Sequence, residues 1–155
     1  MDPKWTNVTE RKVAGIEIRT TNQAEMSPST AKIPSLWGRF YQEKIQELMP
    51  AKKMDARTMG VYSKYASDHT APYSLLAGVE VSTLDPLPEG MTGITIPAGN
   101  YLIFTAHGSM PQALIQTWGT IWEYFSGDPR YQRAYTFDFE LYQAPDRVDV
   151  HIAVK

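Results

Sequence analysis

The sequence predicts a single α+β domain of 155 residues, in which two strand-helix-strand-strand units pack their helices on one antiparallel sheet. Three observations predict this fold. Segments with strand and helix periodicity occur in the same order in both halves of the chain. A Trp-Gly pair lies inside the helical segment of each half, and in each half a Tyr is followed by an Ala-Pro pair. A stretch rich in Pro, residues 83–91, separates the two halves.

The first unit covers about residues 12–82. Its expected elements, a strand, a helix and a hairpin of two strands, lie at residues 12–21, 33–49, 58–67 and 73–82. The helix is indicated by apolar residues at helical spacing, with Pro34 in its first turn and Pro50 immediately after its last. Alternation of apolar and polar residues in the first strand is typical of a strand with one buried face.

The second unit covers about residues 92–155 and repeats this order. Its expected elements, an extended segment, a helix and two strands, lie at residues 92–108, 109–125, 134–143 and 147–155. Ser109 is predicted to cap the helix, which the sequence Gly-Asp-Pro at 127–129 is predicted to end. Two units of this kind, related by a pseudo-twofold axis, predict a central cleft between them.

Residues 136–142, TFDFELY, alternate strictly and place Glu140 and Tyr142 on the face opposite Phe139. Superposing the two halves on Tyr65 and Tyr142 makes Ser63 the counterpart of Glu140, so the carboxylate is expected to have no acidic counterpart. An ionised Glu among aromatic rings has a raised pKa unless a cation or hydrogen-bond donors compensate for its burial. A ligand cation would supply this compensation, although the alternation by itself also fits a solvated strand face.

Composition argues against several functional classes. The chain is 43% hydrophobic and 21% charged with a net charge of -2, which offers no electrostatic basis for binding nucleic acid or an anionic membrane. The absence of an apolar leader or a membrane-spanning run predicts a cytoplasmic protein. Because cysteine is absent and His69, His107 and His151 are far apart, no metal or cofactor site is expected. The sequence also lacks phosphate-loop, nucleophile-elbow and zinc-protease motifs, so no catalytic residues are predicted.

Seven segments in order, VAGIEIRT, IPSLWGRF, GVYSKY, YSLLAGVEV, IPAGNYLIF, TWGTIWEYF and DFELY, resemble the GyrI-like effector-binding domain. The resemblance covers about residues 13–154. That domain is also attached to AraC-type and MerR-type transcription regulators and occurs as free-standing integron cassette proteins. The resemblance implies a cleft for small molecules, often lipophilic cations, with Glu140 as the acid at its floor and Tyr142 on the same strand face. It also implies cleft tryptophans at Trp37, Trp118 and Trp122.

The expected function is therefore non-enzymatic binding of a small lipophilic or aromatic, cationic organic molecule. The expected ligand-binding residues are Glu140, Tyr142, Trp37, Trp118, Trp122, Tyr65, Tyr41 and Tyr73. Two alternatives remain open: hydrolysis of a reactive small molecule by a Glu and a Tyr, and inhibition of DNA gyrase by protein interaction. Because the resemblance takes up nearly the whole chain, no attached DNA-binding segment and no direct contact with nucleic acid are expected.

Overall fold

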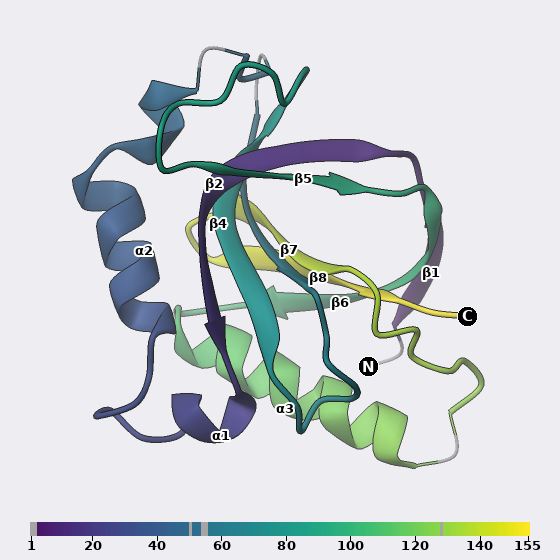
Figure 1. Cartoon of the computed structure of the whole chain (residues 1–155). Helices are drawn as coiled ribbons and strands as arrows, with labels where there is room; N and C mark the ends of the chain where they lie inside the picture. Colours follow the sequence, from purple (N-terminus) through teal and green to yellow (C-terminus); the bar gives the residue numbers. More distant parts are fainter. Residues whose placement is uncertain (1–2, 50, 54–55, 128) are drawn as a thin grey trace.

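The computed structural model describes residues 3–49, 51–53, 56–127 and 129–155, and it contains an eight-stranded antiparallel sheet (Figure 1). The strands are β1 Lys4–Val8, β2 Arg11–Thr20, β3 Thr58–Ser63, β4 Tyr73–Val81, β5 Thr92–Ile96, β6 Gly99–His107, β7 Asp138–Ala144 and β8 Arg147–Ala153. The helices are α1 Asn22–Glu25, α2 Ile33–Gln42, the 3₁₀ helix η1 Ile45–Leu48 and α3 Gln112–Ser126. Helix α2 packs on β2 and β4, and α3 packs on β6. No helix in the described part of the chain is both long and apolar enough to cross a membrane.

The order of the strands confirms the predicted α+β fold with pseudo-twofold symmetry. The sheet runs β1-β6-β8-β7-β3-β4-β2-β5, so the sequence β3-β4-β2 on one side of the centre mirrors β7-β8-β6 on the other. The centre of the sheet is thus the antiparallel pair β3 and β7. At the two edges the units exchange strands, because β5 pairs with β2 of the first unit and β1 pairs with β6 of the second. Strand β1 was not predicted, because only Val8 among its five residues is buried and its sequence shows no hydrophobic alternation.

Both predicted helices are shorter than expected. The first ends at Gln42, and Lys44, which has a left-handed backbone with φ 51°, separates it from η1. The prediction that Ser109 caps the second helix is wrong: α3 begins at Gln112 after Pro111, and only the backbone carbonyl of Ser109 accepts a hydrogen bond, from the N–H of Ala113. Helix α3 ends at Ser126, immediately before Gly127 of the predicted Gly-Asp-Pro stop, while Pro50 and Asp128 lie outside the described residues.

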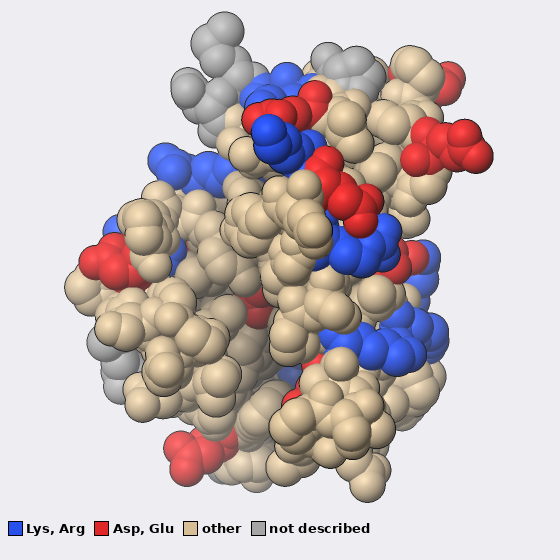
Figure 2. Space-filling model, turned by 90° about the vertical axis from the view of Figure 1, so that its left-hand side faces the viewer, with Lys and Arg blue, Asp and Glu red and all other residues tan. Residues whose placement is uncertain are grey.

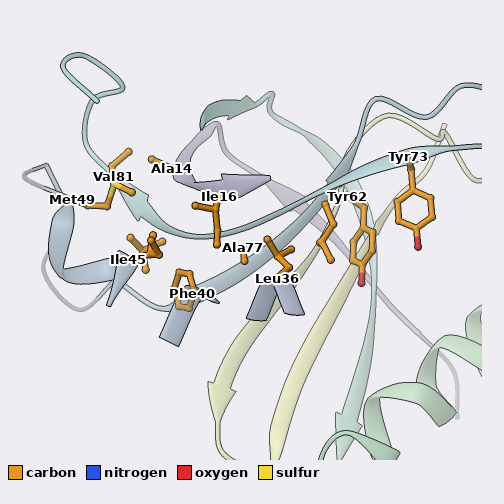
Figure 3. Close-up of a cluster of buried hydrophobic side chains, with 12 residues drawn as sticks. Ala14, Ile16, Leu36, Phe40, Ile45, Met49, Tyr62, Tyr73, Ala77 and Val81 are labelled. Carbon is orange, nitrogen blue, oxygen red and sulfur yellow. The ribbon is translucent and has the colours of Figure 1, made fainter. Parts of the chain in front are cut away.

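Buried side chains form three clusters that cover both faces of the sheet. Under α2, Leu36 and Phe40 pack with Ile16 and Ala77 of the sheet, and Tyr62 and Tyr73 lie at the end of this cluster (Figure 3). A second cluster under α3 contains Leu102, Phe104, Ile121, Val148, Val150 and Ile152. The opposite face of the sheet carries a third cluster, which contains Met59, Val61, Leu76, Tyr101 and Phe139. Because both faces are covered, the central strands can hold polar side chains only where those side chains have partners.

One buried histidine gives a testable acid sensitivity. His151 lies on the face of Phe139, with ring centroids 4.2 Å apart, and its Nδ1 donates to the carbonyl of Asp149 at 3.1 Å. Burial lowers the pKa of His151 to about 4. Between pH 6.5 and about 4 this side chain is therefore protonated in the unfolded chain but neutral in the folded chain. Stability is therefore lost as the pH falls from 6.5 toward 4, by roughly 2 kcal/mol between pH 7 and pH 5.

Urea unfolding at pH 7 and pH 5 measures this loss. We expect His151→Gln to reduce the difference between the two pH values, because glutamine does not titrate. The control His107→Gln, in which the side chain replaced is 71% exposed, should leave the difference unchanged. An identical pH dependence in His151→Gln and in the unaltered protein would contradict the assignment.

Candidate functional site

Glu140 is a buried carboxylate at the centre of the sheet, on the face that carries the helices. Its residue is 1% exposed. The carboxylate accepts three hydrogen bonds: Tyr62 Oη and Trp118 Nε1 donate to Oε2 at 2.7 and 2.8 Å, and Tyr142 Oη donates to Oε1 at 2.8 Å. These donors come from β3, α3 and β7, so the site is assembled from both units.

The surroundings of Glu140 combine burial with uncharged hydrogen-bond donors. Burial raises the pKa of Glu140, while the hydrogen bonds from Trp118, Tyr62 and Tyr142 act in the opposite direction. Burial and the neighbouring carboxylate raise the pKa values of Tyr62 and Tyr142, so both phenols stay protonated donors. Within the described part of the chain, no cationic side chain forms an ion pair with Glu140. The carboxylate is thus hydrogen-bonded but has no positively charged partner among the residues that the structure describes.

The pairing of β3 with β7 corrects the predicted symmetry of the site. Gly60 lies directly across from Glu140 in the register, and Tyr62 and Tyr142 each follow two residues later on their own strands. Because the strands are antiparallel, the two tyrosines reach the carboxylate from opposite directions. The counterpart of Glu140 is therefore Gly60. The prediction of Ser63 is wrong, because Ser63 is an odd number of residues from Gly60 and its side chain points to the other face.

Two of the three predicted tryptophans pack across the pseudo-twofold axis. Trp37 of α2 contacts Tyr142 of the second unit, with ring centroids 5.3 Å apart. Trp118 of α3 contacts Tyr62 of the first unit at 5.1 Å. Each helix thus places its Trp against the tyrosine of the opposite unit. The structure brings Glu140, Tyr142, Trp37 and Trp118 together as expected, while Tyr62 is a site residue that the prediction omitted.

The remaining predicted aromatic residues lie farther from Glu140. Tyr73 is 5.6 Å from Tyr62 and 6.0 Å from Tyr65, ring centroid to ring centroid, so these three form a continuous row. Tyr41 and Trp122 are 61% and 42% exposed and each lies 6.2 Å from a site tryptophan, so they form the outer margin of the site.

The face of the molecule on the side of α2 is hollowed (Figure 2). Figure 2 views the molecule from the side of α2 and shows a hollow near the middle of this face, with an acidic group at its floor and uncharged side chains around it. A surface cavity of about 350 Å³ is lined by Tyr41, Thr58, Met110, Tyr142, Gln143, Ala144 and Pro145. Tyr142 lines this cavity and also donates to Glu140, so it links the cavity to the buried carboxylate.

A second buried carboxylate, Asp138, lies two residues before Glu140 on the same strand face. It is 0% exposed and accepts hydrogen bonds from Arg133 Nη2 at 2.9 Å, from the Ala153 N–H at 2.8 Å and from the Tyr65 hydroxyl. Asp138 is thus neutralised by a cation of the protein itself. The partners that the described residues offer Glu140, on the same face of β7, are uncharged hydrogen-bond donors.

The family model of the integron-associated effector binding proteins matches residues 6–154. The chain belongs to this family. Among solved structures, the effector-binding protein is similar to an integron cassette protein of Vibrio cholerae, VCH_CASS2, with a TM-score of 0.86. The two sequences are 34% identical, and the match covers 99% of this chain and 96% of that chain. The expected GyrI-like relationship and fold are confirmed.

Two further proteins resemble this effector-binding protein. The protein YobU of Bacillus subtilis (strain 168) is 29% identical over 157 residues, which cover 97% of this chain and 96% of YobU. The structure of SAV2435 bound to tetraphenylphosphonium has a TM-score of 0.79 with 22% identity, and covers 100% of this chain and 94% of that chain. At this identity the likeness to SAV2435 shows the fold alone.

Gly60 provides the space that the carboxylate of the effector-binding protein occupies. A Cβ atom at Gly60 would lie 2.9 Å from Glu140 Oε1 and 3.2 Å from Trp37 Cζ2. We therefore expect Gly60→Ala to lower the free energy of unfolding by about 1–3 kcal/mol, the usual cost of overpacking, and to weaken the bond from Tyr142. Urea denaturation measures this effect.

Gly38→Ala is the matched control for this substitution. It replaces the glycine beside Trp37 on α2, where an added Cβ meets nothing within 4 Å. Alanine is the better helix former by about 1 kcal/mol, so this variant should be more stable than the unaltered protein. Equal stabilities of the two alanine variants would show that Gly60 does not provide space for Glu140.

Proposed function

We propose that this effector-binding protein captures a small lipophilic or aromatic organic cation, with Glu140 as the counter-ion, and does not turn it over. The observation that carries the proposal is the buried carboxylate of Glu140, which three aromatic side chains orient and which no cationic side chain among the described residues neutralises. Membership of an effector-binding family supports a small-molecule ligand. The structure of SAV2435 with tetraphenylphosphonium supports a lipophilic cation for a protein of this fold.

The surroundings of Glu140 favour a cation of this chemistry. Aromatic ring faces attract positive charge, and Trp37, Trp118, Tyr62 and Tyr142 present such rings around one acid. Apolar groups of the ligand would gain free energy by leaving water, while its charge would replace the solvation that Glu140 lost on burial. We propose that the ligand enters from the cavity beside Tyr142 and displaces that ring from the path to the carboxylate.

The hydrolase alternative has less support from the site. A general base needs a lone pair that a water molecule can reach, and Glu140 is 1% exposed and already accepts three hydrogen bonds, which leave one lone pair on Oε1. The raised pKa values of Tyr62 and Tyr142 keep both phenols protonated at neutral pH, so neither is available as a base. Inhibition of gyrase stays a prediction that a supercoiling assay would test.

A thermal-shift and calorimetric comparison of three compounds of similar shape tests the proposal. The compounds are tetraphenylphosphonium, neutral triphenylphosphine oxide and anionic tetraphenylborate. A ligand that binds only the folded chain raises its melting temperature by mass action, and we expect this rise with the phosphonium alone. An equal rise with tetraphenylborate would show that hydrophobic contact decides binding and would reject Glu140 as the counter-ion. Recovery of each compound unchanged after incubation checks the absence of turnover.

Proton release should accompany the binding of the cation. Burial raises the pKa of Glu140 in the free protein, and a bound cation favours the ionised form and so lowers this pKa. Near the free-state pKa the affinity should therefore rise with pH, and binding should release up to one proton. Calorimetry in buffers of different ionisation enthalpy measures the release, and an enthalpy that is independent of the buffer at every pH would contradict the linkage.

A further inference from the structure

Arg133 is a buried guanidinium placed among aromatic rings, beside the proposed ligand site. Its residue is 8% exposed. The guanidinium carbon lies 4.5 Å from the ring centroid of Tyr135, 5.6 Å from that of Tyr65 and 5.9 Å from that of Trp118. Asp138 supplies a carboxylate at 2.9 Å. An organic cation bound by a protein has the same kinds of neighbours, a carboxylate and several ring faces.

Charge and ring faces hold Arg133 more than specific hydrogen bonds do. A guanidinium has five N–H donors. In the described structure, Nη2 donates to Asp138 Oδ2 at 2.9 Å and to Tyr65 Oη at 3.3 Å, while Nε is buried without an acceptor. The surroundings of Arg133 therefore suit a delocalised cation of this size rather than one particular pattern of donors. We call these surroundings, Asp138, Tyr65, Trp118 and Tyr135, the Arg133 seat.

The backbone holds Arg133 in this seat from a segment distant in sequence. Arg133 forms a β-bridge with Val154, and the N–H of Ala134 donates to the carbonyl of Ala153 at 2.9 Å. Tyr135 has a left-handed backbone with φ 55°, which few residues other than glycine adopt without a compensating interaction. The ring of Tyr135, which lies nearest to the guanidinium, supplies such an interaction.

The Arg133 seat adjoins the Glu140 site. Asp138 and Glu140 share one face of β7, and residues two apart on a strand have Cα atoms roughly 7 Å apart. Trp118 belongs to both places, because its Nε1 donates to Glu140 while Arg133 lies over its ring. The face of β7 at the proposed ligand site therefore has two buried carboxylates, of which Arg133 neutralises one.

We propose that Arg133 occupies a second cation seat, beside the one at Glu140, and thereby limits the Glu140 site to ligands with one positive charge. The charge limit rests on the proposed binding of a cation at Glu140, whereas the seat itself does not. In a ligand with two cationic groups close together, the second group would lie against the Arg133 guanidinium, which repels it, instead of against an unpaired Asp138 carboxylate. Without Arg133, Asp138 and the three rings would accept that second charge.

Chemical rescue tests the seat without any ligand at Glu140. Arg133→Ala should be destabilised, and millimolar methylguanidinium should raise its melting temperature by about 3 °C or more through binding in the vacated seat. Methylguanidinium should not raise the melting temperature of the unaltered protein or of the control Arg147→Ala, whose side chain is 51% exposed beside Asp149. No rise in Arg133→Ala, or an equal rise in the control, would overturn the seat.

The proposed limit to one positive charge is tested by comparing the affinities for a singly and a doubly charged ligand. The probes are benzamidinium and para-phenylene bisamidinium, two flat cations that differ by one amidinium group. Calorimetry should show that the unaltered protein prefers benzamidinium, and that Arg133→Met shifts the ratio of affinities toward the bisamidinium by about tenfold or more. Arg133→Met with Asp138→Asn, which also removes the second carboxylate without leaving an unpaired charge, should restore the original preference.

Two results would overturn the charge limit. One is an unchanged ratio of affinities in Arg133→Met; the other is the same shift in the double variant, which would show that space rather than the Asp138 charge is responsible. If the unaltered protein binds neither benzamidinium nor tetraphenylphosphonium, the proposed function and the charge limit fail together, and the rescue experiment alone decides the seat.

Discussion

Glu140→Gln is expected to weaken tetraphenylphosphonium binding by about 30-fold or more. Removing one partner of a buried charge pair costs about 2 kcal/mol or more, and here the ligand would keep its charge in an apolar site without a counter-ion. Glutamine is close to glutamate in shape and keeps one acceptor oxygen for Trp118 and the tyrosines, so the loss reports the charge rather than the volume. Isothermal calorimetry measures the affinity.

Glu80→Gln is the matched control for this experiment. Glu80 is a carboxylate of β4 that pairs with Arg11 and Lys53 near the surface, so its loss should leave the affinity unchanged within about twofold. The proton release predicted for cation binding should also disappear in Glu140→Gln and persist in Glu80→Gln. Unchanged affinity in Glu140→Gln would remove the counter-ion role, whatever the stability of the variant.

The sequence was sufficient to predict which face of β7 holds Glu140 but not which residue lies opposite. Strict alternation from 136 to 142 separates Glu140 from Phe139, and the structure confirms that Phe139 packs in the core of the other face. The partner strand has no equally strict pattern, and aligning Tyr65 with Tyr142 shifted the comparison by an odd number of residues. An odd shift exchanges the two faces of a strand. Aligning Gly60-Val-Tyr62 with Glu140-Leu-Tyr142 instead would have predicted the second tyrosine at the carboxylate.

Other parts of the site could not be read from local pattern. Arg133 lies in an irregular segment, and a pairing with Val154 near the C-terminus places it beside Asp138. Strand β1 likewise depends on pairing with β6, which is distant in sequence. Hydrophobic periodicity indicates which face of a segment is buried and which is exposed to water. It does not indicate which distant segment lies beside it. The family resemblance supplied the role of Glu140, and the structure alone supplied the environment of Asp138.

The two acids of β7 therefore have opposite electrostatic roles despite sharing one strand face. Asp138 is paired with Arg133 inside the protein, which makes it part of the structure. Glu140 is held by neutral donors, which orient it without cancelling its charge. Neutral donors are suited to a site that must exchange a cation, because the charge stays available while its direction is fixed in advance. Substitution at the two positions should accordingly separate stability from binding.

Asp138→Asn is expected to lower the free energy of unfolding by about 3 kcal/mol or more, because it leaves the Arg133 guanidinium buried without a counter-charge. The asparagine amide group would also face two donors, Arg133 Nη2 and the Tyr65 hydroxyl. Glu43→Gln, which breaks a surface pair with Arg39 in which both side chains are about half exposed, should cost about 1 kcal/mol or less. Urea denaturation compares the two variants. Equal losses would mean that the buried pair contributes no more than the surface pair, and that Asp138 does not need Arg133.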